Sequence, residues 1–172
     1  GRIHEQIYHS CIAAGLKQKN TSVRLYHLGY DQNEADSKKK SERNINLLKK
    51  MVEETPDSGY THFTLGQCYS LRGDDILAVH HFEEAYKLKN MSRQLTGSLL
   101  NCLADSYFNL GHIDKSLEFA DKSIKMFNKQ IGGYLLHYKI FNAKDKNEKA
   151  LTYLNRVLNY LEYFKTHPKT LS

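Results

Sequence analysis

The chain has 172 residues, of which 40% are hydrophobic and 26% charged, the proportions of an ordinary folded protein. Its formal net charge is +6. No apolar run approaches the roughly 20 residues needed to cross a membrane, so we expect no transmembrane helix. Two prolines and no tryptophan suit a mostly helical chain. No signal peptide is visible. Three cysteines without metal-ligand spacing are interpreted as reduced, and we therefore predict a cytoplasmic location.

Residues 1–37 are predicted to form an appendage. Residues 2–16 have the spacing of a helix that Gly15 would end, whereas residues 21–30 alternate as a β-strand does. A lone strand cannot satisfy its own backbone groups, and no other segment has a strand pattern. The strand is therefore either an exposed remnant or part of a sheet that lies upstream.

Residues 38–56 are predicted to form an N-terminal capping helix. Its apolar face consists of Ile45, Leu48, Met51 and Val52, and Pro56 follows. The other positions carry many basic side chains, diluted by glutamates and without aromatic rings. This pattern favours a solvated outer face over a surface for phosphate or an acidic partner, and it predicts no nucleic-acid binding.

Residues 57–172 are predicted to form three helical hairpins, over about 59–92, 97–130 and 131–164. The first has the clearest register, in Leu65, Gly66, Tyr69, Gly73, Ala78, Phe82 and Ala85. Gly66 and Ala78 are small, so two helices can approach closely there. Gly73 supplies the positive φ that ends the first helix, and Asp74 is placed to cap the second.

The other two hairpins follow this register less strictly. In the second, the matching residues are Leu103, Ala104, Tyr107, Gly111, Ser116, Ala120 and Ser123. Because Tyr107 follows Tyr69 by 38 residues rather than 34, we expect a longer first helix or a wider loop near residues 89–95. In the third, His137 and Tyr138 take the Leu–Gly positions of a first helix over residues 131–143. Residues 159–167 either continue the last helix or form a short capping helix.

This register resembles the tetratricopeptide repeat, a 34-residue helix–turn–helix unit. The resemblance implies an all-α, right-handed solenoid of antiparallel helix pairs with a short helix and strand appendage. In such repeats the second, fifth, ninth and twelfth positions of each first helix line the concave face. Here these positions hold Tyr60, Phe63, Gln67, Ser70, Ser98, Asn101, Asp105, Phe108, Gly132, Leu135, Lys139 and Asn142.

Rings supply contact area and amides bind peptide backbone, so the concave face is predicted to bind a peptide or protein. The alternatives are that these side chains only face solvent, or that residues 160–164 fill the groove. Chaperone-binding repeats of this fold clamp a terminal carboxylate with lysine and asparagine. Phe63 and Gln67 stand at those positions here, which disfavours that ligand.

A second resemblance precedes the repeats. Residues 2–6 (RIHEQ), 23–30 (VRLYHLGY) and 40–48 (KSERNINLL) resemble the C-terminal end of bacterial family 2 glycosyltransferases that carry tetratricopeptide repeats. The resemblance implies a region that positions an acceptor or makes a dimer, with His4, Glu5 and His27 bordering the active site of a longer protein. The alternative is that these three are polar residues at a domain junction.

No catalytic, cofactor-binding or metal-binding constellation is predicted in the chain. His80 and His81 are adjacent, so they point about 100° apart on a helix and make a poor metal pair. His4 and His9 are five apart, whereas the zinc-protease helix needs histidines four apart. His62 is expected to pack or to face solvent, as is His137.

The three cysteines, Cys11, Cys68 and Cys102, lack the spacing of metal ligands. We interpret them as reduced packing residues rather than redox or metal groups.

We therefore predict an interaction module that has no chemistry of its own and no cofactor. Its partner would be a protein or peptide, with a second copy of the chain among the candidates. The alternative is the accessory region of a glycosyltransferase. An enzyme in its own right is disfavoured, because no catalytic constellation is present.

Overall fold

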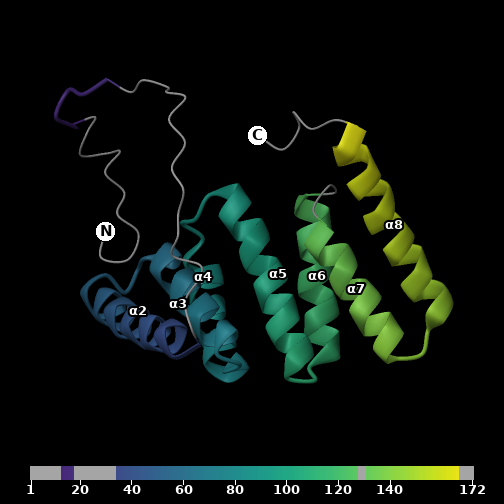
Figure 1. Ribbon diagram of the computed structural model, residues 1–172, viewed down its shortest axis with the longest axis horizontal. Coiled ribbons are helices and arrows are strands. Elements are labelled where there is room, and N and C mark those ends of the chain that lie inside the picture. Colours follow the sequence, from purple (N-terminus) through teal and green to yellow (C-terminus); the bar gives the residue numbers. More distant parts are fainter. Residues whose placement is uncertain (1–12, 18–33, 128–130, 167–172) are drawn as a thin grey trace.

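The computed structural model describes residues 13–17, 34–127 and 131–166, and over these ranges all the regular elements are helices. They stand side by side in chain order (Figure 1). Their bounds are Glu34–Glu54 (α2), Gly59–Leu71 (α3), Asp75–Leu88 (α4), Arg93–Asn109 (α5), Ile113–Met126 (α6), Ile131–Ala143 (α7) and Asn147–Thr166 (α8).

The helices form three antiparallel hairpins, α3/α4, α5/α6 and α7/α8, that stack on one another. Each hairpin contacts the next through its second helix, so that α4 packs on α5 and α6 packs on α7. The first helices also touch one another, α3 with α5 and α5 with α7, whereas no contact joins α4 with α6 or α6 with α8 among the described residues. The row therefore curves, with α3, α5 and α7 on its inner side.

The first hairpin closes around Gly66, as the register predicted. A Cβ atom on Gly66 would lie 2.5 Å from Phe82 Cδ1 and 3.2 Å from the carbonyl oxygen of Ala78. The Phe82 ring is fully buried against this backbone. Gly73 has a φ of +78°, and the Asp74 carboxylate accepts a hydrogen bond from the backbone N–H of Leu77. The predicted helix end and cap are therefore confirmed.

The second hairpin absorbs its four extra residues in its first helix. α5 has 17 residues and α3 has 13, so the insertion adds about one turn to the start of α5. Ser92 caps that turn by accepting a hydrogen bond from the backbone N–H of Leu95. The longer helix, rather than a wider loop, is the alternative that the structure confirms.

The third hairpin begins with α7, over the residues that the sequence predicted. Gly133 lies against α6, where a Cβ atom would come within 2.8 Å of Ile124 Cγ1. His137, at the position of Leu65 in the register, is buried, and its Nδ1 lies 2.9 Å from the carbonyl oxygen of Gly133. Its Nε2 lies 3.0 Å from Asp121 Oδ1. His137 therefore has the packing role that was one of its two expected roles.

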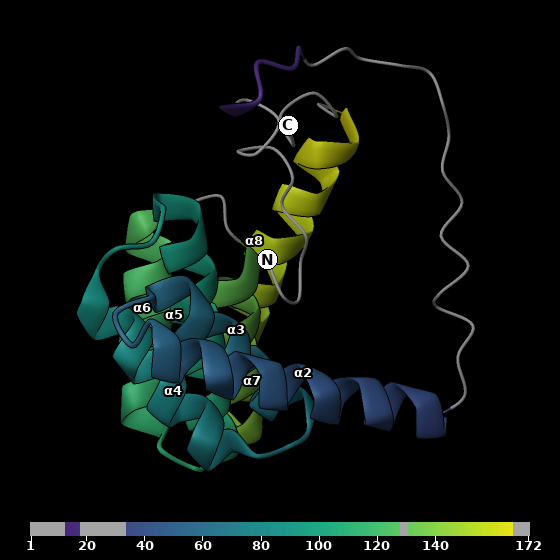
Figure 2. The same cartoon turned by 90° about the vertical axis from the view of Figure 1, so that its left-hand side faces the viewer.

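Helix α2 covers the N-terminal end of the stack, next to the first hairpin. It packs only on α3 among the described elements, through buried Ile45 and Leu48. It begins at Glu34, four residues before the predicted start, and ends at Glu54. Figure 2 shows α2 crossing the front of the stack.

At the other end, α8 is one continuous helix to Thr166, so residues 159–166 continue it and do not form a separate cap. The strand predicted over residues 21–30 lies outside the described residues. Gly15, which is described, has a φ of +71°, the left-handed conformation expected where a helix ends. Among the described residues, every helix is too short or too polar to cross a membrane.

Candidate groove on the inner face

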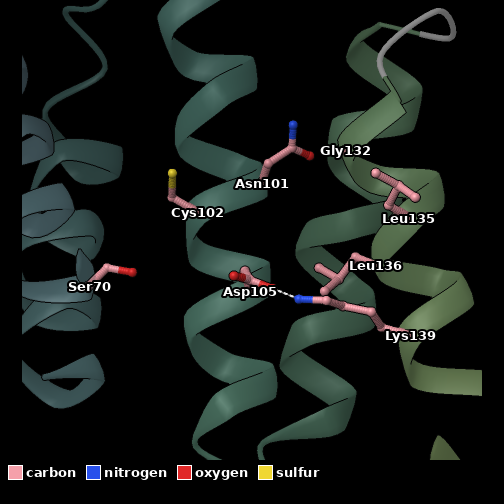
Figure 3. Close-up of a pocket in the computed structure, with 8 residues that line it drawn as sticks. All are labelled: Ser70, Asn101, Cys102, Asp105, Gly132, Leu135, Leu136 and Lys139. Atoms are coloured by element: carbon pink, nitrogen blue, oxygen red, sulfur yellow. Dashed lines mark hydrogen bonds and ion pairs between the residues drawn. The ribbon is translucent and has the colours of Figure 1, made fainter. Parts of the chain in front are cut away.

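The inner face of the solenoid is hollowed between its three first helices. A hollow of about 310 Å³ is lined by Ser70 from α3, by Asn101, Cys102 and Asp105 from α5, and by Gly132, Leu135, Leu136 and Lys139 from α7. Figure 3 shows Cys102 directed toward α3 and Asn101 toward α7. The hollow thus depends on how the three hairpins stack, and no single hairpin contains it.

One ion pair crosses this hollow. Lys139 Nζ donates to Asp105 Oδ1 at 2.8 Å and joins α7 to α5 (Figure 3). Both side chains are about half exposed, so the pair contributes little to stability. It leaves a positive and a negative group at the edge of the hollow, where each can meet a polar group of a ligand.

Asn101 lies on the α7 side of the hollow. Its Oδ1 accepts a hydrogen bond of 2.7 Å from Ser123 Oγ, which fixes the side-chain amide. The amide nitrogen lies against Gly132, where a Cβ atom would come within 2.5 Å of it. A Cβ atom at residue 132 would therefore displace the Asn101 amide, which lies in the space beside this glycine.

A second hollow of about 340 Å³ adjoins the first, and the two share Ser70 and Cys102. It is lined by Thr64, Gln67, Cys68, Ser70, Leu71, Phe82 and Cys102. Together the two hollows form a groove along the inner face, which we call the inner groove. Its walls are apolar with a few amide, hydroxyl and charged groups, the composition of many peptide-binding surfaces.

Both cysteines of the inner groove are half-buried and pack against the core. Burial raises the pKa of the Cys68 thiol. Burial, and to a lesser degree the Asp105 carboxylate, raises the pKa of Cys102 to about 11. Both are therefore neutral thiols at neutral pH, which agrees with the packing interpretation. Cys11 lies outside the described residues.

Because the thiolate is the reactive form, we expect Cys68 and Cys102 to be alkylated slowly by iodoacetamide at pH 7.5. Their rates in the folded protein should be at least about tenfold lower than in the urea-unfolded chain. Mass spectrometry of the digested peptides separates the sites. Equal rates in the folded and unfolded chains would contradict these raised pKa values.

The structure places most of the predicted groove residues on the inner face. Asn101, Asp105, Leu135 and Lys139 line the first hollow, and Gln67 lines the second. Ser70 and Gly132 also line the first hollow. Tyr60 is exposed, and Phe108 is half-buried beneath the Lys139 ammonium group, which lies 5.9 Å from its ring centre. That these residues bind a partner stays a prediction.

Phe63 was predicted to line the groove, but the structure places it in the core. Only 3% of its surface is exposed, and its ring packs against Phe82 at a centroid distance of 6.0 Å. A ring of this size gains more free energy from burial in the core than from facing water. Phe63 is therefore a core residue, and its replacement would test stability rather than binding.

The sequence reasoning missed five apolar residues of the inner groove, which are Cys68, Leu71, Phe82, Cys102 and Leu136. Cys68, Cys102 and Leu136 each lie one position after a predicted groove residue. A predicted concave face that was about 100° wider on each first helix would have included these three residues, because residues one apart on a helix differ by about 100° in direction.

The inner groove is not filled by residues 160–164. α8 packs on α7 alone among the described helices, and no α8 residue lines either hollow. The Tyr160 ring instead lies 5.6 Å from the Tyr134 ring on the far side of α7. The alternative in which the chain fills its own groove with this segment is wrong.

The histidines of the first hairpin form a packed cluster. His62 Nδ1 lies 3.1 Å from His81 Nδ1, and His62 Nε2 lies 3.1 Å from the carbonyl oxygen of Pro56. The Tyr69 ring stacks on His81. Among the described residues, no group of three or more histidine, cysteine or acidic side chains is placed to hold a metal ion. His4, Glu5 and His27 lie outside the described residues.

No protein-family model and no curated protein matches the chain. Solved structures of MamA, a tetratricopeptide-repeat protein, have the same architecture. The structure of MamA MSR-1 C2 has a TM-score of 0.64 at 16% identity, over 74% of this chain and 71% of that chain. Another crystal structure of MamA has a TM-score of 0.64 at 20% identity, over 76% and 69% of the two chains. The fold is thus a tetratricopeptide-type helical solenoid.

Proposed function

We propose that this chain is an interaction module that binds an extended peptide or protein segment in the inner groove. The observation that carries the proposal is the groove itself, which is built from the first helices of three successive hairpins. Solenoids of this kind present their inner surface as a continuous binding site. No catalytic constellation accompanies the groove in the described residues.

The groove side chains favour an extended ligand with both apolar and polar contacts. Leu135 and Leu136 offer apolar surface, Asn101 holds an amide at the wall, and the Asp105–Lys139 pair offers both charges. An extended peptide has backbone N–H and C=O groups along its length, which pair with such amide and charged groups. Apolar side chains of the peptide would then occupy the hollows.

Replacing Lys139 with glutamate tests the proposal. The substitution places two like charges in the hollow and removes the ammonium donor, so a groove ligand should bind at least about tenfold more weakly. Peptides selected from a random 12-residue display library on the immobilised chain serve as probes. Their affinities for the original and substituted proteins are measured by fluorescence anisotropy.

Lys122→Glu is the matched control, because Lys122 pairs with Glu118 on α6, outside the groove, and has a similar exposure. It should leave binding of the selected peptides unchanged. A library that yields no binder would contradict the proposal. So would selected peptides whose affinity is the same for Lys139→Glu as for the original protein.

We also infer a second candidate role, as the accessory region of a family 2 glycosyltransferase that positions an acceptor or makes a dimer. The support is the resemblance of residues 2–6, 23–30 and 40–48. The gene sequence upstream of Gly1 tests it. A sheet-rich region with paired aspartates would support this role, and any other kind of upstream sequence would contradict it.

A further inference from the structure

The outer side of α8 carries an apolar stripe that no described element covers. Leu151, Leu154, Leu158 and Leu161 are spaced by three, four and three residues, which places them on one face of the helix. The exposed fractions of Leu151, Leu158 and Leu161 are 56%, 52% and 46%. We call these four leucines the α8 stripe. α8 stands at the end of the stack, and no other described helix lies beyond it (Figure 1).

The α8 stripe corresponds to the surface on which hairpins stack within the solenoid. In the 34-residue register, Ala120 and Ile124 of α6 match Leu154 and Leu158 of α8. Those two α6 residues receive α7, since the backbone of Gly133 lies against Ile124 and the carbonyl oxygen of Ala120. The stripe therefore has the register of a helix-receiving surface, and a helix is the element that such a surface receives within this solenoid.

The stripe is also symmetric along its length. Asn147 precedes it by four residues and Lys165 follows it by four, so the spacing reads the same in both directions. When two such helices lie antiparallel about a two-fold axis near residue 156, Leu151 meets Leu161 of the other copy and Leu154 meets Leu158. The polar ends, Asn147 and Lys165, meet as well. A two-fold interface needs such self-complementarity.

We propose that the α8 stripe is a self-association surface, which pairs α8 of two copies of this chain in antiparallel orientation. The proposal does not depend on the groove or on its ligand. Four leucines per copy give less contact area than the roughly 800 Å² per partner of a standard interface. The dimer should therefore be weak, forming at micromolar concentrations and dissociating on dilution.

Sedimentation equilibrium of the full 172-residue chain between about 1 and 200 µM measures this association. We expect a monomer–dimer equilibrium, and Leu158→Glu should weaken it at least about tenfold because it places a charge in the centre of the pair. Ile76→Glu is the matched control. It changes an exposed aliphatic residue on α4 to the same charge, and it should leave association unchanged. Circular dichroism verifies that both variants keep the helical fold.

A mixing experiment tests the antiparallel pairing itself. Leu151→Glu alone and Leu161→Lys alone should each weaken the dimer. In an equimolar mixture of the two variants, the introduced glutamate of one copy would face the introduced lysine of the other, so dimers should form again as the mixed species. In a parallel pair, each introduced charge would face a leucine of the other copy, so mixing the two variants would not restore the dimer.

Three results would overturn the proposal. The first is a monomer at every concentration, which would leave the stripe to a helix of a different protein. The second is association that Leu158→Glu and Ile76→Glu affect equally. The third is a mixture that associates no better than the separate variants.

Discussion

Replacing Gly66 with alanine is expected to lower the free energy of unfolding by about 1–3 kcal/mol. The added Cβ atom would lie 2.5 Å from the Phe82 ring, which is fully buried and cannot move without displacing its neighbours. Alanine normally stabilises a helix relative to glycine by about 1 kcal/mol, so a net loss would mean that steric overlap outweighs the gain in helix propensity. Urea denaturation of the two proteins measures the difference. Leucine at this position should cost more, because it adds volume to the same contact.

The second hairpin has alanine where the first has Gly66, together with a small residue where the first has Phe82. At the matching positions it has Ala104 and Ala120, a pair in which both side chains are small. Phe82→Ala alone should cost about 3–5 kcal/mol through the cavity that it leaves. In the double variant Gly66→Ala with Phe82→Ala, the new methyl group enters that cavity. The combined loss should then fall short of the sum of the two single losses by at least about 1 kcal/mol.

An additive double variant would contradict this account of the first hairpin. So would a Gly66→Ala protein that unfolds at the same urea concentration as the original. Either result would mean that Gly66 and Phe82 do not share one packing contact, and the register on which the first hairpin rests would fail.

Acidification from pH 7 to about pH 4.5 is expected to destabilise the first hairpin. The carbonyl oxygen of Pro56 can only accept, so His62 Nε2 carries the hydrogen between them, and neutral His62 has a bare Nδ1. His81 Nδ1–H donates to that nitrogen across 3.1 Å. This hydrogen bond requires that one of the two Nδ1 atoms carries no hydrogen.

The direction of the pH effect also follows from His81. Its burial, reinforced by His80, His62 and Lys49 against a weaker opposite effect of Glu84, lowers its pKa from 6.5 to about 4. The unfolded chain thus binds a proton at a higher pH than the folded chain does. The stabilising contribution is complete above pH 6.5 and is lost as the pH falls toward 4. Because His81 is half-buried, we expect about 1–2 kcal/mol rather than the full value of the shift.

His81→Gln separates this effect from the general titration of carboxylates. The glutamine amide can still donate to His62 Nδ1 but does not titrate, so the unfolding free energy should change less between pH 7 and pH 5 than in the original protein. His112→Gln removes an exposed histidine and should keep the original pH dependence. Urea unfolding at several pH values measures all three. Parallel curves for His81→Gln and the original protein would contradict the prediction.

Much of the fold could be predicted from the sequence because its determinants are local. Gly73 ends α3 and Asp74 caps α4 through contacts within a few residues, and the spacing of small and large side chains specifies how each hairpin closes. The third hairpin shows the same for α7, whose bounds match the prediction. Such signals act through backbone geometry and helical periodicity, which can be recognised in the amino-acid sequence alone.

The predicted inner groove was less complete, since its residues are selected by contacts between hairpins. Helical periodicity gives the direction of a side chain, but the neighbour that it meets depends on how the next hairpin stacks. Phe63 has a groove position in the register, yet it turns to Phe82 and is buried. Cys102 and Leu136 lie one residue beyond the register and line the groove, because α3, α5 and α7 converge there.

The sequence by itself determined the hairpins, their order and the turns between them, since spacing, caps and positive-φ glycines are properties of short segments. Only the tertiary structure decided the rest. It converted the four-residue insertion into an extra turn of α5, joined three helices into one groove and kept α8 out of it. These outcomes depend on how the packing of all the hairpins divides apolar surface between the core and water, and that division is a property of the whole stack.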